Sequence, residues 1–181
     1  MANHLIVIYG PPLVGKSTLA WSLARSLPGK TAVVSLDALL GGSIAIADSD
    51  ATAELDMVHT QLRLLVANYL KNRYHVVVEG PFRYEWDGVQ HDFEADIDQL
   101  VALMRHLAQG ALVVRLDASP ETLMQRAAAS GRESELPVAL RLREAYRARS
   151  GDRSLSFDTS AVGPEDIVSE IREARLAERV V

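Results

Sequence analysis

Residues 10–17 read Gly-Pro-Pro-Leu-Val-Gly-Lys-Ser, which matches the pattern G-x-x-x-x-G-K-[ST] at every fixed position. The apolar run at residues 5–9 precedes this segment, and a helix-forming run at residues 18–24 follows it. A strand before and a helix after is the context in which this pattern forms a loop around phosphate groups. A glycine turn with an incidental lysine would not require that context. We therefore predict a site for a nucleoside triphosphate.

Each part of this loop has a physical role in holding phosphates. Glycines let the backbone approach phosphate oxygens, so that successive N–H groups point into the concavity. The helix that begins after Gly15 adds its positive N-terminal end. Lys16 can reach the β- and γ-phosphates, and the Ser17 hydroxyl can join the shell of a magnesium ion. The predicted nucleotide-binding residues are Gly10, Pro11, Pro12, Leu13, Val14, Gly15, Lys16, Ser17 and Thr18.

Length and composition narrow the kind of protein that carries this loop. A chain of 181 residues favours one domain, and the absence of cysteine excludes disulfides, thiolate zinc sites and a cysteine nucleophile. No apolar stretch approaches the ~20 residues of a membrane span, and no leader precedes the first strand, so we expect a cytoplasmic protein with no membrane contact. A net charge of −5 favours a small-molecule partner over nucleic acid. The sequence indicates no oligomeric state.

Hydrophobic patterning predicts strands alternating with helices. We expect strands at residues 5–9, 31–36, 75–78, 111–116 and 155–159, with loops after residue 37 and over residues 79–93. Helices are expected at residues 16–27, around 55–69, 97–107 and 138–146, and after Ser119 and Gly163. This alternation predicts a parallel sheet with helices on both faces, whose ligands bind beyond the carboxyl ends of the strands.

Two acidic residues stand at such strand ends. Asp37 follows the second strand, where a carboxylate could orient an acceptor hydroxyl and take its proton, or could cap the next helix. We expect catalysis, with capping as a compatible second role. Glu79 ends the third strand and could hold a magnesium-bound water or contact the acceptor. We favour the role beside the metal.

Three segments together resemble the small P-loop kinases: the phosphate loop, the strand end Ser35-Leu36-Asp37, and the strand end Val-Val-Val-Glu79-Gly80. Among these kinases the chain is most similar to the chloramphenicol phosphotransferase-like enzymes, and it is also akin to polynucleotide, shikimate and gluconate kinases. The resemblance implies a P-loop NTPase fold, a three-layer α/β/α arrangement with a parallel five-stranded sheet of order 2-3-1-4-5. It also implies ATP with Mg²⁺ as donor, and transfer of the γ-phosphate to a hydroxyl with Asp37 as the base.

The resemblance further implies a short mobile lid, which would fall at about residues 126–137 of a single domain spanning residues 1–181. Fixed positive charge must meet the negative charge of the transferring phosphate. Arg126 and Arg132 are the candidates, and Arg132 follows a stretch of small residues that could form a hinge. The dense arginine cluster of the family is reduced here to these two, with Arg143 and Arg147 on the next helix. Arg141 and Arg149 are expected to be solvated.

An aromatic segment follows the third strand and contains Phe82, Tyr84, Trp86 and Phe93. It could stack on the acceptor, with Arg83 or His91 placing a polar group, or it could simply plug a long loop. His59 is expected on the surface or in the core, and not as a ligand.

Three functions are compatible with these residues. The first is a kinase that phosphorylates a hydroxyl of a small molecule, such as an antibiotic or another specialised metabolite. The second is a kinase of nucleosides, nucleotides or polynucleotide 5′-hydroxyls, although a polynucleotide would call for a basic channel. The third is a binding or regulatory protein that hydrolyses ATP slowly and has no acceptor, against which Asp37 argues.

Overall fold

A central five-stranded sheet organises the chain in the computed structural model, which describes residues 3–43, 51–86, 88–104, 106–108, 110–147 and 155–177. All neighbouring strands of this sheet pair in parallel. Their order is β2 (Thr31–Ser35), β3 (His75–Gly80), β1 (His4–Tyr9), β6 (Gly110–Asp117), β7 (Leu155–Asp158). Sequential strands that pair in parallel need helical crossovers, which the chain supplies.

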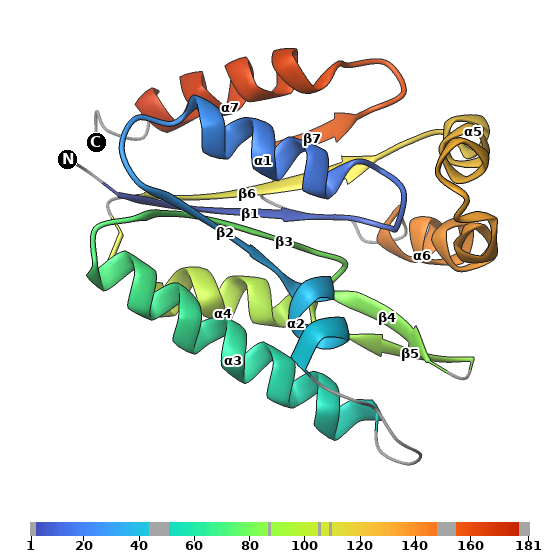
Figure 1. The fold of residues 1–181 in the computed structure, drawn as a ribbon, viewed down its shortest axis with the longest axis horizontal. Coiled ribbons are helices and arrows are strands. Elements are labelled where there is room, and N and C mark those ends of the chain that lie inside the picture. The colour runs from blue at the N-terminus through green and yellow to red at the C-terminus, as the bar shows by residue number, and fades with distance from the viewer. Residues whose placement is uncertain are drawn as a thin grey trace.

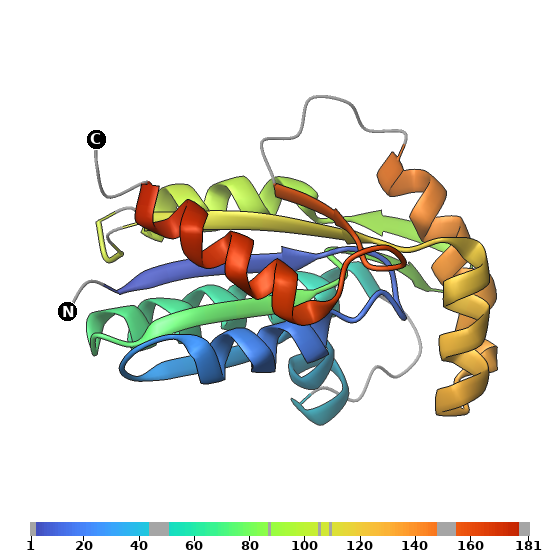
Figure 2. The same ribbon diagram turned by 90° about the horizontal axis from the view of Figure 1, so that it is seen from above.

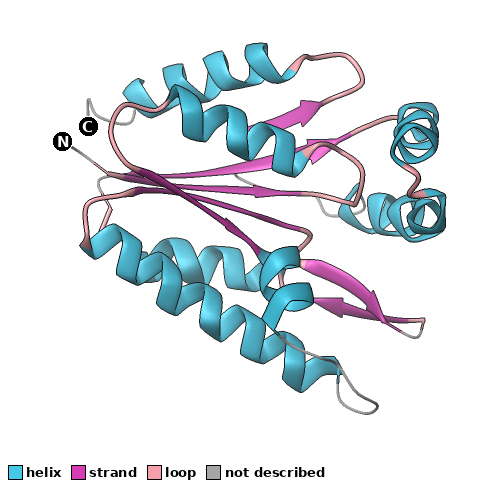
Figure 3. Cartoon of the chain, viewed as in Figure 1, coloured by secondary structure: helices cyan, strands magenta, loops and turns pink. Residues whose placement is uncertain are grey.

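Helices cover both faces of the sheet, as Figures 1 and 3 show. One face carries α1 (Lys16–Ser26) and α7 (Pro164–Ala177), and the other carries α3 (Ala51–Lys71) and α4 (Glu94–Met104). The remaining helical elements are α2 (Leu36–Ser43), α5 (Pro120–Ser130), a 3₁₀ turn (Glu133–Glu135) and α6 (Leu136–Arg147). Figure 2 shows α5 and α6 together at the end of the molecule toward which the strands run. The arrangement has the predicted α/β/α layers.

A small antiparallel hairpin lies between the third and fourth strands of the parallel sheet in the chain, so it changes the numbers of the later strands. Strands β4 (Arg83–Trp86) and β5 (Val89–Asp92) lie where the sequence predicts a loop, so the predicted order 2-3-1-4-5 becomes β2-β3-β1-β6-β7. Each segment predicted as a strand of the parallel sheet is found as that strand, but the ends differ by one or two residues. Leu36 and Thr159 lie outside β2 and β7, whereas β3 continues to Gly80. The pattern misses the hairpin because β5 reads Val-Gln-His-Asp, which lacks an apolar face.

The loop predicted after residue 37 is also wrong, because α2 begins at Leu36. Two glycines and a short length conceal this helix from a search for periodicity. The Ser35 hydroxyl accepts a hydrogen bond from the Ala38 N–H at 3.3 Å, so Ser35 holds the start of the helix. A Cβ on Gly80 would come within 2.5 Å of the Leu36 side chain, which shows how closely α2 packs on the end of β3.

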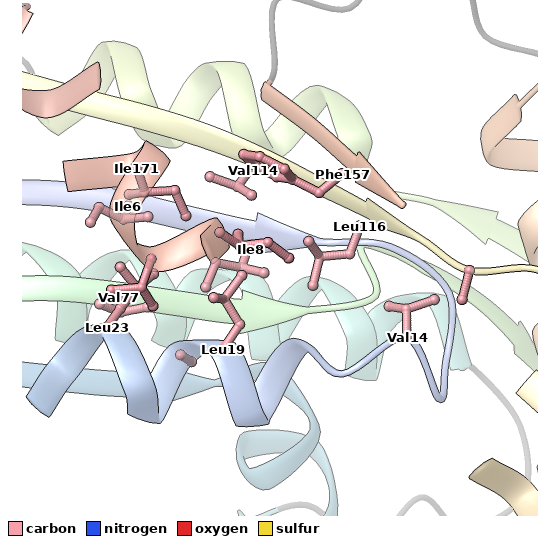
Figure 4. Packing of buried hydrophobic residues seen from close by; sticks show 14 of the residues in the cluster. Ile6, Ile8, Val14, Leu19, Leu23, Val77, Val114, Leu116, Phe157 and Ile171 are labelled. Atoms are coloured by element: carbon pink, nitrogen blue, oxygen red, sulfur yellow. The ribbon is translucent and has the colours of Figure 1, made fainter. Parts of the chain in front are cut away.

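The core lies on both sides of the sheet because alternate residues of β1 point to opposite faces. Ile6 and Ile8 pack with residues of α1 and α7, whereas Leu5 and Val7 pack with residues of α3 and α4. All residues of β1 and β3 are buried, as expected for central parallel strands. Figure 4 shows that Val14 of the phosphate loop belongs to the first of these clusters, so the core anchors the loop. No described helix is both long enough and apolar enough to cross a bilayer.

Candidate active site

A cavity of about 800 Å³ opens at the carboxyl edge of the sheet. Its walls come from the phosphate loop, from the segments that follow β2, β3 and β7, and from α5 with the 3₁₀ turn after it. Most of the predicted site residues line this one cavity: Pro12 to Thr18, Asp37, Arg126 and Arg132. Gly10, Pro11 and Glu79 are not among the residues that line it. Gly10 and Pro11 precede this part of the loop, and Glu79 is buried on β3, next to the strand that leads into the loop.

The backbone of the phosphate loop adopts conformations that most residues avoid. Gly10 has φ +146° and Gly15 has φ +95°, and Leu13 lies at φ +69° although it is not glycine. A Cβ on Gly10 would stand 2.3 Å from the Leu116 carbonyl oxygen of β6, so no larger residue fits there without movement. Helix α1 begins at Lys16 directly after Gly15, which aims its N-terminus at the cavity.

The Lys16 ammonium is folded back onto its own loop. Its Nζ donates to the Pro11 carbonyl oxygen at 2.9 Å, and the residue is 6 % exposed. Burial lowers the pKa of Lys16, and the nearby carboxylates of Asp37 and Glu79 oppose that shift. The Lys16 ammonium therefore already lies among negatively charged groups. Phosphate oxygens could replace these carboxylates as its partners.

Asp37 lies in the first turn of α2 and is exposed to the cavity. Since Ser35 already caps this helix, the Asp37 carboxylate is not needed for capping. Its negative charge also acts on Lys16 and Arg132, which places these three charged groups close together. Asp37 is therefore an exposed carboxylate whose charge acts on the lysine of the phosphate loop.

Glu79 sits between the phosphate-loop strand and the strand that leads to Asp37. It pairs in register with Ile8 of β1 on one side and Ser35 of β2 on the other. The residue is 2 % exposed, and its Oε2 has no hydrogen-bond partner among the described residues. A buried carboxylate oxygen without a partner is costly, so it calls for a water or a cation that the protein alone does not supply.

Arg126 is committed to supporting the phosphate loop. Its Nη1 donates to the Leu13 carbonyl oxygen at 3.2 Å and to Thr159 Oγ1 at 2.9 Å, and its Nη2 donates to the Thr159 carbonyl oxygen at 2.9 Å. The Thr159 hydroxyl in turn donates to the Val14 carbonyl oxygen at 3.0 Å. The sequence places Thr159 at a strand end but does not predict these hydrogen bonds between Thr159, Arg126 and the phosphate loop. Only the three-dimensional approach of β7 to the loop reveals them.

Arg132 stands at the start of the 3₁₀ turn and pairs with Glu135. Its Nε and Nη2 donate to the two carboxylate oxygens at 2.6 and 2.5 Å, and both side chains line the cavity. The small-residue stretch before Arg132 is helical as far as Ser130, and Gly131 ends α5 in the left-handed region at φ +66°. Of the predicted hinge stretch, Gly131 is the residue that lies outside α5. The lid predicted at residues 126–137 spans the end of α5, this turn and the start of α6, and its mobility stays a prediction.

Two arginines of α6 hold that helix to the sheet. Arg143 is buried and donates from Nε to Asp117 Oδ1 at 2.8 Å and to the Ala118 carbonyl oxygen at 2.6 Å. Arg147 lies 3.6 Å from Asp117 Oδ2. Arg141 was expected to be solvated, and it is exposed but pairs with Glu85 of the hairpin. Arg149 lies outside the described residues.

The aromatic segment forms a buried cluster around His59 of α3. The His59 ring stacks on Phe93 with centroids 4.4 Å apart, and it meets Phe82 and Tyr84 edge-on at 5.5 and 6.0 Å. His59 is thus a core residue, as expected. Of the four aromatic residues only Trp86 is exposed, at 38 %. Most of the aromatic side chains of this segment therefore pack into the protein interior, in agreement with the interpretation in which they close a long loop.

Polar contacts fix the orientation of the His59 ring. Its Nδ1 lies 3.1 Å from Asp96 Oδ2, and its Nε2 lies 3.4 Å from the Tyr84 hydroxyl. Burial lowers the pKa of His59 to about 4, against the opposing effect of Asp96, so the ring is neutral at pH 7. Burial likewise raises the pKa of Tyr84, which stays protonated. The Nδ1 atom has no partner with hydrogen-bonding geometry among the described residues, so its approach to Asp96 is a charge contact.

Comparisons with solved structures agree with this architecture. A gluconokinase from Sinorhizobium meliloti superposes with a TM-score of 0.59 at 24 % identity, covering 98 % of this chain and 95 % of its own. A shikimate kinase from Bacteroides thetaiotaomicron gives 0.61 at 16 % identity, with 94 % and 97 % covered. A tunicamycin resistance protein from Deinococcus radiodurans gives 0.63 at 14 % identity, with 95 % of each chain covered. At such identities the likeness concerns the fold.

A search of curated proteins finds no match. A protein-family model described as an AAA domain matches residues 5–151, which include the phosphate loop, Asp37, Glu79 and both candidate arginines. The chain therefore belongs to the AAA domain family.

Proposed function

We propose that this protein is an ATP- and Mg²⁺-dependent kinase that transfers the γ-phosphate to a hydroxyl of a small molecule. One observation carries the proposal: the exposed Asp37 carboxylate and the buried Lys16 of the phosphate loop line the same cavity. A protein that only bound or slowly hydrolysed ATP would not need this carboxylate. The resemblance to chloramphenicol phosphotransferase-like enzymes and the fold shared with small-molecule kinases support an antibiotic or another metabolite as acceptor. Use of ATP agrees with a cytoplasmic location.

The residues divide the reaction between them. The loop N–H groups and Lys16 hold the β- and γ-phosphates, for which Lys16 Nζ turns from the Pro11 carbonyl oxygen. Asp37 orients the acceptor hydroxyl and accepts its proton as the new oxygen–phosphorus bond forms. The bond between the γ-phosphorus and the bridging oxygen breaks, and ADP leaves with that electron pair. Asp37 later releases the proton to solvent.

The residues present fit a magnesium ion. The Oε2 of buried Glu79, which has no hydrogen-bond partner among the described residues, is the observation that tests this fit. The exposed Ser17 hydroxyl is the second oxygen, at the start of α1. Few protein ligands are expected, because Mg²⁺ usually keeps several waters and binds phosphates directly. When bound, the ion neutralises charge on the β- and γ-phosphates.

The two candidate arginines take different parts in this proposal. Arg126 is occupied by Leu13 and Thr159, so it shapes the phosphate loop and its edge of the cavity. Arg132 lines the cavity, and its ion pair among the described residues is with Glu135, with both side chains well exposed. It is the arginine free to move onto the transferring phosphate, at the cost of a surface ion pair of about 0–1 kcal/mol.

The test compares two variants with one control. Lys16→Ala should abolish transfer, whereas Asp37→Asn should keep ATP binding and slow acceptor-dependent ADP release by about 10²-fold or more. Asp98→Asn changes an exposed aspartate of α4 and should change neither. ATP binding is measured by calorimetry and transfer by release of ADP. Equal loss of binding and rate in Asp37→Asn would make Asp37 structural and refute its role as base.

A further inference from the structure

We propose that the acceptor of this kinase is uncharged or positively charged, and that it is not a carboxylate or a phosphate. The inference rests on the proposed function and adds the class of substrate to it. It concerns the charged groups near Asp37 on α2, the β4–β5 hairpin and α6, which Figure 1 shows at the same end of the molecule.

Arg83 is the cation that the hairpin could offer to an anionic acceptor, and it already has two carboxylate partners. Its Nη2 lies 2.8 Å from Asp92 Oδ2, and its Nε donates to Glu94 Oε1. Glu94 is 5 % exposed, so the pair is partly sealed from water. The Arg83 guanidinium also lies 5.5 Å from the ring centroid of Tyr146. Arg83 therefore neutralises carboxylates of its own hairpin and of α4.

The other arginines of this region are paired in the same way. Arg141 bonds both carboxylate oxygens of Glu85, which ties α6 to the hairpin. Arg143 bonds Asp117, and Arg132, which bonds Glu135 in an exposed pair, is the arginine already assigned to the transferring phosphate. Arg115 lines a separate cavity of about 310 Å³, together with Asp117 and Asp158.

Among the described residues near Asp37, the charged groups outside these ion pairs include two carboxylates. Asp37 faces the cavity with its carboxylate exposed, and Glu79 has an oxygen without a hydrogen-bond partner among the described residues. Lys16 has phosphates to hold. The bound nucleotide adds further negative charge that one Mg²⁺ only partly cancels.

An anionic acceptor would meet two penalties here. It would stand beside Asp37 and the triphosphate, and like charges placed together cost several kcal/mol of binding in comparable interfaces. To recruit Arg83 it would also have to displace a carboxylate, which would break the ion pair between Arg83 and buried Glu94. A hydroxyl or an ammonium group instead donates to Asp37 without disturbing any pair.

The experiment compares acceptors that differ in charge but share a skeleton. Suitable sets are glucosamine, glucose and gluconate; adenosine and adenosine monophosphate; and shikimate with its methyl ester. Within a set, kcat/KM for the uncharged or amine-bearing member should exceed that for the anion by about tenfold or more. Gluconate and shikimate carry carboxylates, so both should be poor acceptors. A carboxylate or phosphate that is the best acceptor of its set, with a KM that rises in Arg83→Gln, would overturn the inference.

Removing a carboxylate provides a gain-of-function test. Asp92→Asn removes the exposed carboxylate that pairs with Arg83, and Glu94→Gln removes the buried one. Both should improve kcat/KM for the anions relative to the neutral members. Asp98→Asn is the matched control and should not. The exposed Asp92 variant keeps the test valid if Glu94→Gln fails to fold.

Failure of the proposed function has a separate signature, because no compound would then stimulate ADP release although Mg–ATP still binds. Binding then decides the inference. Gluconate or sulfate titrated into the complex with Mg²⁺ and a non-hydrolysable ATP analogue should give no heat of binding. Binding of either anion that Arg83→Gln abolishes would overturn the inference.

Discussion

His59 makes the stability of this fold dependent on pH in a defined window. The ring is buried within the aromatic cluster between α3, the hairpin and α4, where burial lowers its pKa from 6.5 to about 4. Asp96, Arg63 and Asp56 modify that shift, but desolvation dominates. Between pH 6.5 and pH 4 the unfolded chain therefore binds a proton that the folded chain does not.

The sign and size of the effect follow from proton linkage. Because the unfolded state binds more protons, the free energy of unfolding rises with pH across this window and falls on acidification. Each pKa unit corresponds to about 1.4 kcal/mol, so His59 removes about 2 kcal/mol by pH 5 and about 3 kcal/mol by pH 4. Above pH 7 its contribution to the pH dependence vanishes.

Urea unfolding at several pH values measures this contribution. His59→Phe keeps the ring that stacks on Phe93 but cannot take a proton, so its profile should lack the part of the acid-induced loss that His59 contributes. The loss from pH 7 to pH 4 should be smaller in His59→Phe than in the wild type by about 3 kcal/mol. His106→Gln, at an exposed position, should retain the wild-type profile. Parallel profiles for the wild type and His59→Phe would show that His59 does not stay neutral in the folded state.

Two further predictions concern the phosphate loop and the metal. Glu79→Gln should raise the Mg²⁺ concentration needed for half-maximal activity by roughly 10- to 100-fold, the usual effect of losing a residue that supports a metal. Glu121→Gln on the exposed side of α5 is its control, and an unchanged Mg²⁺ requirement would separate Glu79 from the ion. Gly10→Ala should cost roughly 2–4 kcal/mol of stability and weaken ATP binding, because its Cβ would stand 2.3 Å from the Leu116 carbonyl oxygen. Gly41→Ala, with no atom within 4 Å of the new Cβ, should cost nothing, and equal melting temperatures for the two variants would contradict the steric account.

Local patterns in the sequence predict much of the fold. The phosphate-loop motif between a strand and a helix, and the apolar runs of β1 and β3, depend on residues near one another in the chain. The cap at Ser119 with Pro120 behind it is equally local, and the Ser119 hydroxyl does accept from the Thr122 N–H. The two elements that the patterns missed, α2 and the hairpin, are short and lack a clear apolar period.

Asp37 and Glu79 could be proposed from sequence because parallel strands bring their carboxyl ends to one edge, whatever the details of packing. The roles of the arginines could not, since a guanidinium reaches far and its partner is set by whichever chain segment arrives beside it. Arg126 bonds residues 113 and 33 positions away, and Arg141 bonds Glu85, 56 positions away. Sequence thus determined the phosphate-loop pattern and the parallel sheet, whereas the tertiary structure alone decided which charged groups pair within the fold and which line the cavity. Ion pairing at such separations depends on the completed packing, which no local pattern encodes.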